Sequence, residues 1–287
     1  MDDRRLFVQF IHPGGEHQPD RDNGKAWNVG GHKRKFLISH GRFLDRGELR
    51  EDNLLFWGEW EPQSRVVRRF EERARDWPQF LYQPYYGGPD GVQSICRQNT
   101  DPFVFGEQFH YTGCLQHTKR GPTQLHNLDR GSIILFGSCR DKSKFVIDTV
   151  FVVDRWLDHS QANQLTPEIR DAVSATYGEV TLDPWYARNV PRDQTHRLYF
   201  GATFEDKVDG MFSFFPCQTE KDAGSGFPRP IIRIDHWITQ TLLQGKKMTA
   251  LSDGEAAQRV WAEVIGQVED QGLKLGVSAD LPRRSAV

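Results

Sequence analysis

The sequence predicts one α+β domain over residues 1–287, with a mixed or barrel-like β core, peripheral helices and long ordered loops. Three observations predict this fold class. Two apolar runs between Gly131 and Asp154 have the composition of buried strands. The run from Ser252 to Gln271 repeats apolar residues at helical spacing. No repeat or domain linker divides the chain, and 37% apolar residues are enough to bury a sizeable core.

The N-terminal third opens with a predicted strand, Phe7 to Ile11, which ends at a turn rich in proline and glycine. After a polar stretch, a glycine pair precedes Lys33, Arg34 and Lys35. Consecutive cations beside glycines are the best local candidate for holding phosphate in this chain.

The segment from Phe56 to Pro62 places two indoles and two carboxylates within seven residues. If it is extended, Trp57, Glu59 and Glu61 share one face, and Trp60 lies on the other. Trp offers a stacking surface and carboxylates accept hydrogen bonds, so one face suits a planar or sugar-like ligand. The alternative is an edge strand with a half-buried Trp and solvated Glu residues.

The remaining elements follow from periodicity and turn residues. Helices are expected over Ser64 to Trp77, from Thr166 onwards, and over Ser252 to Gln271, where Ser252 and Glu255 have capping-box spacing. Phe80 to Gly88 and residues 179 to 200 resemble loops. The expected strands are Ser132 to Ser138, Phe145 to Val153, Met211 to Phe215 and Ile231 to Ile234, and the first two of these form a hairpin.

Composition restricts the classes of function. The formal charge is -2, from 37 basic and 39 acidic residues, so a polyanion would have to bind a local patch. We expect a cytoplasmic protein without a membrane partner, because no signal-like N-terminus or run of about 20 apolar residues occurs. The scattered cysteines Cys96, Cys114, Cys139 and Cys217 predict reduced thiols and argue against zinc. No nucleotide motif is present, and we expect neither a metal nor a cofactor.

Asp101 stands on a turn that Pro102 restricts, and Phe103 follows. Such a carboxylate would orient water while the ring stacks on a base, which suits hydrolysis of an N-glycosidic bond. The turn resembles the Asp-Pro-aromatic turn of uracil-DNA glycosylases, and His12-Pro13 resembles their His-Pro loop, although the two pieces occur in the opposite chain order. The alternative is that Asp101 caps a turn and Phe103 belongs to the core.

Asp148 interrupts an otherwise apolar strand, so it is either paired structurally or functional. Glu59 and Glu61 would also serve as an acid and a base, but a sequence gives no distance between carboxylates. We therefore take Asp101, Glu59 and Asp148 as the candidate catalytic residues.

Leu128 to Ser138, followed by the strand through Asp148 and Val153, resembles the strand pair of PUA-like barrels, whose ASCH and EVE members share this glycine-and-strand pattern. Members of that superclass recognise modified bases in RNA or DNA, often after flipping them. The chain as a whole resembles bacterial proteins of DNA modification and phage defence, some of which are DNA glycosylases. The resemblance implies that Lys33, Arg34 and Lys35 hold backbone phosphate, while Trp57, Trp60 or Phe103 stacks on a displaced base.

The predicted function is recognition of a flipped, modified DNA base, with hydrolysis of its N-glycosidic bond as an outcome. DNA is the expected partner, and RNA stays open. One alternative is a noncatalytic PUA-like reader of modified nucleic acid, and another is a small-molecule enzyme or a structural protein.

Overall fold

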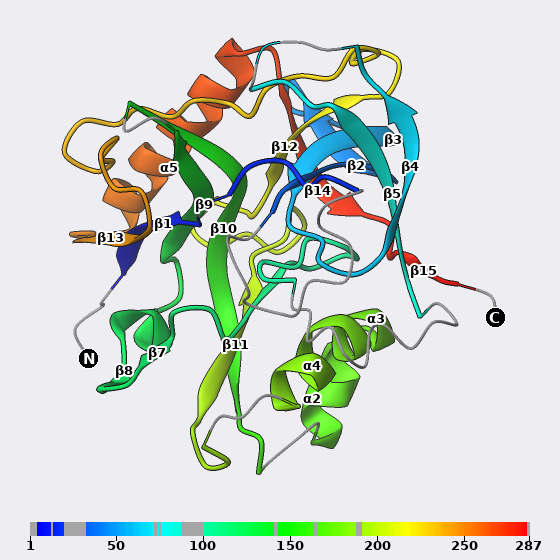
Figure 1. Ribbon diagram of the computed structural model, residues 1–287. Coiled ribbons are helices and arrows are strands. Elements are labelled where there is room, and N and C mark those ends of the chain that lie inside the picture. The colour runs from blue at the N-terminus through cyan, green and yellow to red at the C-terminus, as the bar shows by residue number, and fades with distance from the viewer. Residues whose placement is uncertain are drawn as a thin grey trace.

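Two β-sheets form the centre of the computed structural model, which describes residues 5–12, 14–19, 33–71, 74, 76–87, 100–140, 143–162, 166–187 and 191–285 (Figure 1). The first sheet has the order β13-β1-β9-β10-β11-β6. Its strands are β1 (Leu6–Ile11), β6 (His110–Tyr111), β9 (Ile133–Arg140), β10 (Lys144–His159), β11 (His196–Gly201) and β13 (Gly245–Ala250).

The second sheet has the order β14-β12-β3-β2-β5-β15, and β4 pairs with the other edge of β5. Because β14 pairs with both β12 and β2, the sheet curls. Its strands are β2 (Lys35–Asp45), β3 (Glu48–Gly58), β4 (Ser64–Arg69), β5 (Phe80–Tyr86), β12 (Phe215–Thr219), β14 (Lys274–Ala279) and β15 (Arg283–Arg284). A separate hairpin joins β7 (His117–Thr118) to β8 (Gly121–Pro122).

Helices cover the sheets in two places (Figure 1). The long helix α5 (Gly254–Asp270) buries Val260, Val264 and Val268 in a core cluster with residues of β1, β9 and β14. A group of short helices packs into the other core cluster and comprises α2 (Pro167–Ala172), α3 (Ala175–Tyr177), the π-helical turn η2 (Gly178–Leu182) and α4 (Asp183–Tyr186). A 3₁₀ turn, η1 (Gln124–Asn127), precedes β9. Both clusters contain residues of both sheets.

The coarse prediction of an α+β fold with a sheet-rich core is confirmed. The PUA-like barrel stays a prediction. The predicted β9–β10 hairpin is also confirmed. The helix α5 begins close to its predicted start, but Asp253 and not Ser252 caps it by accepting the N–H of Ala256 at 2.7 Å. The helix expected from Thr166 is α2, where the Thr166 side chain accepts the N–H of Ile169.

Two predictions for the segment between residues 64 and 88 are wrong. Ser64 to Arg69 is the strand β4, whose alternating exposure has the period of a strand that is half-buried. The β-branched Val66 and Val67 suit this conformation better than a helix. Phe80 to Tyr86 is the strand β5 and not a loop. The strand tolerates Pro84 because this residue stands at the end of the β4–β5 ladder, where a missing N–H costs little.

Three further boundaries differ from expectation. The stretch predicted as loop between residues 179 and 200 contains η2, α4 and most of β11. The strand predicted at Met211 begins regular pairing only at Phe215, and Ile231 makes only an isolated bridge to Val146. Short apolar runs therefore predict correctly which residues are buried, but not which of them pair with a neighbouring strand.

Candidate functional site

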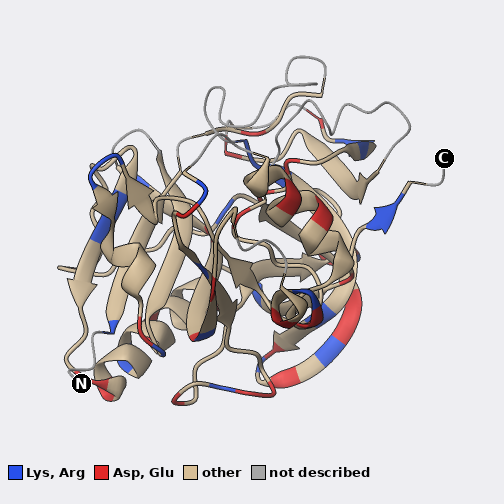
Figure 2. Ribbon diagram, turned by 90° about the horizontal axis from the view of Figure 1, so that it is seen from below, with Lys and Arg blue, Asp and Glu red and all other residues tan. Residues whose placement is uncertain are grey.

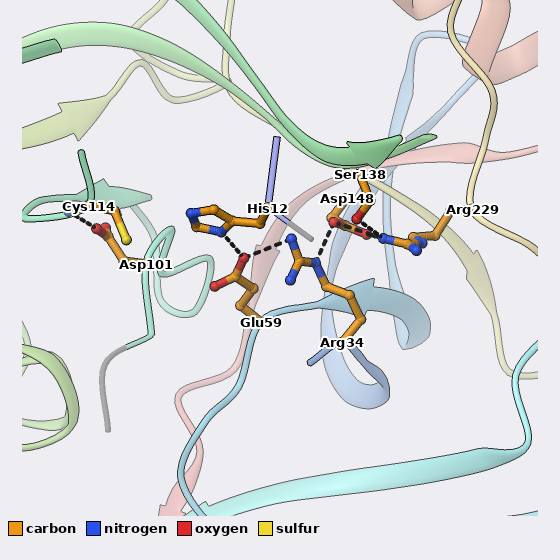
Figure 3. Close-up of polar contacts among 8 residues, drawn as sticks. All are labelled: His12, Arg34, Glu59, Asp101, Cys114, Ser138, Asp148 and Arg229. Atoms are coloured by element: carbon orange, nitrogen blue, oxygen red, sulfur yellow. Dashed lines mark hydrogen bonds and ion pairs between the residues drawn. The ribbon is translucent and has the colours of Figure 1, made fainter. Parts of the chain in front are cut away.

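Five polar side chains meet where the two sheets adjoin, and each comes from a strand end or an irregular position (Figure 3). His12 follows the last residue of β1, Arg34 precedes β2, and Glu59 follows β3. Arg229 lies in the segment between β12 and β13, and Asp148 lies within β10. Side chains within a strand alternate between the two faces of the sheet, but this restriction ends with the last paired residue. Residues at strand ends can therefore point toward one another at the junction.

Asp148 occupies a β-bulge in the hairpin. Ile147 pairs with Gly137 and Thr149 pairs with Phe136, which leaves Asp148 as the unpaired residue between them. A bulge redirects the side chain of the extra residue, which explains how a carboxylate fits an apolar strand. A Cβ on Gly137 would lie 2.1 Å from the carbonyl oxygen of Val146, so the bulge requires glycine there.

The five side chains form a continuous polar chain, which we call the junction network. His12 Nδ1 lies 2.5 Å from Glu59 Oε1, and Arg34 Nη2 lies 2.9 Å from the same oxygen. Arg34 Nε donates to Asp148 Oδ2 at 2.6 Å. Arg229 Nη1 donates to Asp148 Oδ1 at 3.2 Å and to the Ser138 hydroxyl at 2.8 Å. Every carboxylate of the network therefore faces at least one cation.

Burial makes this pairing energetically important. Arg34 is 0% exposed, and His12, Glu59, Asp148 and Arg229 are each 5% exposed or less. Removing a charged group from water is costly unless opposite charge and hydrogen bonds replace the hydration. Burial lowers the pKa of Arg34, but Glu59 and Asp148 outweigh that effect and leave the pKa raised, so the guanidinium stays charged.

Asp101 lies close to the network on a neighbouring turn. Its Oδ1 accepts the N–H of Thr112 at 2.7 Å, and its Oδ2 accepts the N–H of Cys114 at 3.1 Å. The turn is tied to the segment after β3, because Glu61 N–H donates to the Thr100 hydroxyl at 3.3 Å. Figure 3 shows Asp101 and Cys114 on the side of His12 away from Arg34, and the second ring nitrogen of His12, Nε2, points to that side. Glu59 and Asp101 thus approach His12 from different sides.

The aromatic side chains predicted to stack on a base are buried. Trp57 is 3% exposed and donates from Nε1 to the Phe227 carbonyl at 2.8 Å. Trp60 and Phe103 are each 1% exposed and pack on Phe105 with ring centroids 5.1 and 5.5 Å away. The expectation of an open stacking face is corrected here, because residues 54–58 of β3 are buried on both faces of the strand, and Trp60 beyond its end is buried as well.

The cationic run is also not a surface phosphate site. Arg34 belongs to the junction network, and Lys35 is 5% exposed with Nζ donating to the Pro62 carbonyl at 2.8 Å. Burial lowers the pKa of Lys35 to about 7, and Glu61 opposes that effect. Lys33 is half-buried. The glycine pair beside the run lies outside the described residues, whereas Arg34 and Lys35 are directed inward by their places at the start of β2.

Sequence reasoning missed Arg229, Ser138 and the buried His159. Arg229 stands between two prolines in an apolar stretch, which is a weak signal of a buried cation. His159 lies outside the junction network. Its Nε2 contacts the Thr112 hydroxyl at 2.7 Å, and its Nδ1 contacts the Tyr186 hydroxyl at 3.0 Å. Burial lowers the pKa of His159 to about 3, so the ring is neutral at pH 7 and is held at both nitrogens.

Comparisons with known proteins give no relative. No family model matches the chain, and neither a curated protein nor a solved structure matches it. Within the described residues, no helix is long and apolar enough to cross a membrane. The same residues contain no group of three or more His, Cys, Asp or Glu side chains arranged to hold a metal ion.

Proposed function

We propose that the protein recognises a flipped, modified base of DNA and hydrolyses its N-glycosidic bond. The observation that carries the proposal is the contact of Glu59 with both His12 and Arg34 beside the Asp101 turn. Glu59 faces an imidazole and a guanidinium, whereas Asp101 accepts two backbone N–H groups. Two carboxylates in such different surroundings suit two different roles in one reaction.

The roles follow from the reaction. The oxygen of a water molecule bonds to C1′ of the deoxyribose while the C1′–N bond breaks. Asp101 would orient that water and accept its proton, and its charge would stabilise the positive sugar. His12 would donate a proton from Nε2 to the departing base nitrogen, while Glu59 stabilises the ring through Nδ1. One water is consumed, and the products are the free base and an abasic site.

Asp148 has a different assignment. Within the described residues its polar side-chain contacts are with Arg34 and Arg229. We therefore treat it as a positioning residue that holds Arg34 against Glu59, and not as a group that touches the substrate. The candidate catalytic set becomes Asp101, Glu59 and His12.

The preference for a modified base rests on acceptor groups. Glu59 and Glu61 come from one short segment, and carboxylates accept hydrogen bonds from hydroxyl groups that a hydroxymethylated or glycosylated base carries. An unmodified base offers fewer such donors. Because Trp57, Trp60 and Phe103 are buried, we assign them to the frame of the site and not to stacking on the base.

The test is formation of abasic sites in DNA that contains 5-hydroxymethylcytosine, with and without attached glucose, and in unmodified DNA and RNA of the same sequence. Asp101→Asn and Glu59→Gln are each expected to lower the excision rate by about 100-fold or more while the protein still binds. Asp280→Asn is the matched control, because the Asp280 carboxylate is 70% exposed.

Three outcomes decide the proposal. Excision by the wild type that is lost in Asp101→Asn, with an unchanged circular dichroism spectrum, supports it. Tight binding to modified nucleic acid with no product overturns the hydrolase and supports the noncatalytic reader. Absence of both binding and product at low salt overturns the nucleic-acid function altogether.

A further inference from the structure

Three neighbouring strands of the second sheet contain no acidic residue, and two of them carry arginines. The strands β4, β5 and β15 together contain five arginines, while no Asp or Glu occurs in any of them. This composition departs from the chain as a whole, whose formal charge is -2. It also departs from β3 of the same sheet, in which Glu48, Glu51 and Asp52 surround Arg50. Figure 1 shows the three strands together beside the C-terminus, and in Figure 2 the blue arrow next to the C-terminus is β15.

Strand register places two of these arginines in one row with a glutamine and a tyrosine of β5. Arg65 of β4 pairs with Gln83 of β5, and its Nη2 donates to the Gln83 side-chain oxygen at 2.6 Å. Arg283 of β15 pairs with Tyr85. Gln83 and Tyr85 are two residues apart, so they share one face of β5, and the paired arginines share that face with them. Arg65, Gln83 and Arg283 are exposed, and Tyr85 is half-buried.

The charges of this row have no carboxylate partner among the described residues. Within the described part of the chain, no carboxylate lies within 4.0 Å of the Arg65 or Arg283 guanidinium, whereas Arg68 pairs with Glu220 and Arg284 pairs with Glu179. From a strand spacing of about 4.8 Å and a rise of about 3.4 Å per residue, the Cα atoms of Arg65 and Arg283 are roughly 12 Å apart, on either side of β5. Two cations on either side of a strand that carries a half-buried tyrosine on the same face match a nucleotide strand, in which phosphates flank a base.

The chain connects the row to the segment that carries Glu59. β4 begins five residues after Glu59. The carbonyl oxygen of Gln63 accepts two hydrogen bonds, one from the indole N–H of Trp60 and one from the backbone N–H of Tyr85. Arginines on an edge strand also protect it from pairing with another sheet. Protection of an edge accounts for Arg65 on β4. It does not account for Tyr85, because β5 lies between β4 and β15 and is not an edge strand.

We propose that the face formed by Arg65, Gln83, Tyr85 and Arg283 binds a single strand of nucleic acid. Arg65 and Arg283 contact phosphates, and the Tyr85 ring stacks on a base. The inference rests on the proposed function in taking nucleic acid as the substrate, and it replaces Lys33 to Lys35 with a different surface as the phosphate contact.

The test is binding of a fluorescently labelled, unmodified single-stranded DNA of about 12 nucleotides, measured by anisotropy between about 50 and 200 mM salt. Arg65→Glu/Arg283→Glu is expected to weaken binding about tenfold or more at the lowest salt and to reduce the slope of log affinity against log salt by about 1.4, as expected for two phosphates. Arg259→Glu on α5 is the matched control, because Arg259 is 68% exposed on a different element.

Tyr85 separates base stacking from charge attraction. Tyr85→Ala is expected to weaken binding about fivefold or more, and Tyr85→Phe to retain wild-type affinity, because stacking needs the ring and not the hydroxyl. The inference is overturned if the double reversal binds like Arg259→Glu, or if Tyr85→Ala has no effect and heparin competes equally against the wild type and that variant. Since this assay needs no excision, loss of binding in the double reversal upholds the surface even when abasic sites never form.

Discussion

The arginines of this protein occupy two contrasting environments. Arg34 and Arg229 are buried at the junction of the sheets, and each contacts a carboxylate. Arg65 and Arg283 are exposed on the outer face of one sheet and have no such contact within the described residues. The same side chain thus serves to compensate buried charge in one place and is available to a partner in the other. Solvent exposure and the distance to the nearest carboxylate, and not a run of cations in the sequence, separate the two cases.

The contrast is sharpest at Asp148, which contacts both buried arginines. Asp148→Ala is expected to lower the free energy of unfolding by about 3 to 5 kcal/mol, because Arg34 and Arg229 would each lose a buried counter-charge. Urea denaturation followed by fluorescence measures the change. Asp280→Ala, at an exposed carboxylate, should change stability by no more than about 0.5 kcal/mol. A loss below about 1 kcal/mol in Asp148→Ala would show that water or rearrangement replaces the pairing.

The sequence predicted the parts of the fold that local patterns determine. The β9–β10 hairpin and the helix α5 are both recognisable because each buries an apolar pattern of sufficient length. Ser64 to Arg69 is predicted as part of a helix because Val66 and Phe70 also fit a helical period, and only the pairing with β5 decides in favour of a strand. That pairing is a long-range property, so propensity alone could not give it.

The candidate site was predictable in its residues more than in its geometry. Local sequence patterns indicate Glu59, Arg34, His12 and Asp148 separately, and the structure joins all four in one chain of contacts. Their roles were not predictable, because an Arg looks the same in a sequence whether it faces solvent or a carboxylate. Arg65 and Arg283 lie more than 200 positions apart, and only the strand order β4-β5-β15 places them on one face.

Lys35 offers an intermediate case, a buried cation whose pKa is lowered to about 7 by desolvation. In the unfolded chain its pKa is 10.5, so between pH 7 and 10.5 the unfolded state binds a proton that the native state lacks. The free energy of unfolding therefore rises with pH through that window. Below pH 7 both states are protonated, and the whole cost of burying the ammonium is present.

Lys35→Met is expected to stabilise the protein at pH 7 by about 1 to 2 kcal/mol, which is less than the pKa shift alone implies because the bond to the Pro62 carbonyl is lost. The gain should shrink as the pH rises from 7 towards 10, because the native state holds the neutral amine and the cost of deprotonating Lys35 falls as the pH approaches its unfolded-state pKa of 10.5. Urea denaturation at pH 7 and pH 10 measures both values. Lys221→Met, at an exposed lysine, should change stability by no more than about 0.5 kcal/mol at either pH. Destabilisation by Lys35→Met at pH 7 would mean that the ammonium is held by its partners and not merely desolvated.

The smallest effect on stability is expected at the exposed arginines. Arg65→Ala and Arg283→Ala should each change the free energy of unfolding by less than about 0.5 kcal/mol, because neither guanidinium has a carboxylate partner among the described residues. Thermal and urea denaturation of the two variants give the values. A loss above about 1 kcal/mol in either variant would assign its arginine to holding β4 or β15 against β5. The buried and the exposed arginines would then differ only in how much they stabilise the fold, because both groups would contribute to the free energy of unfolding.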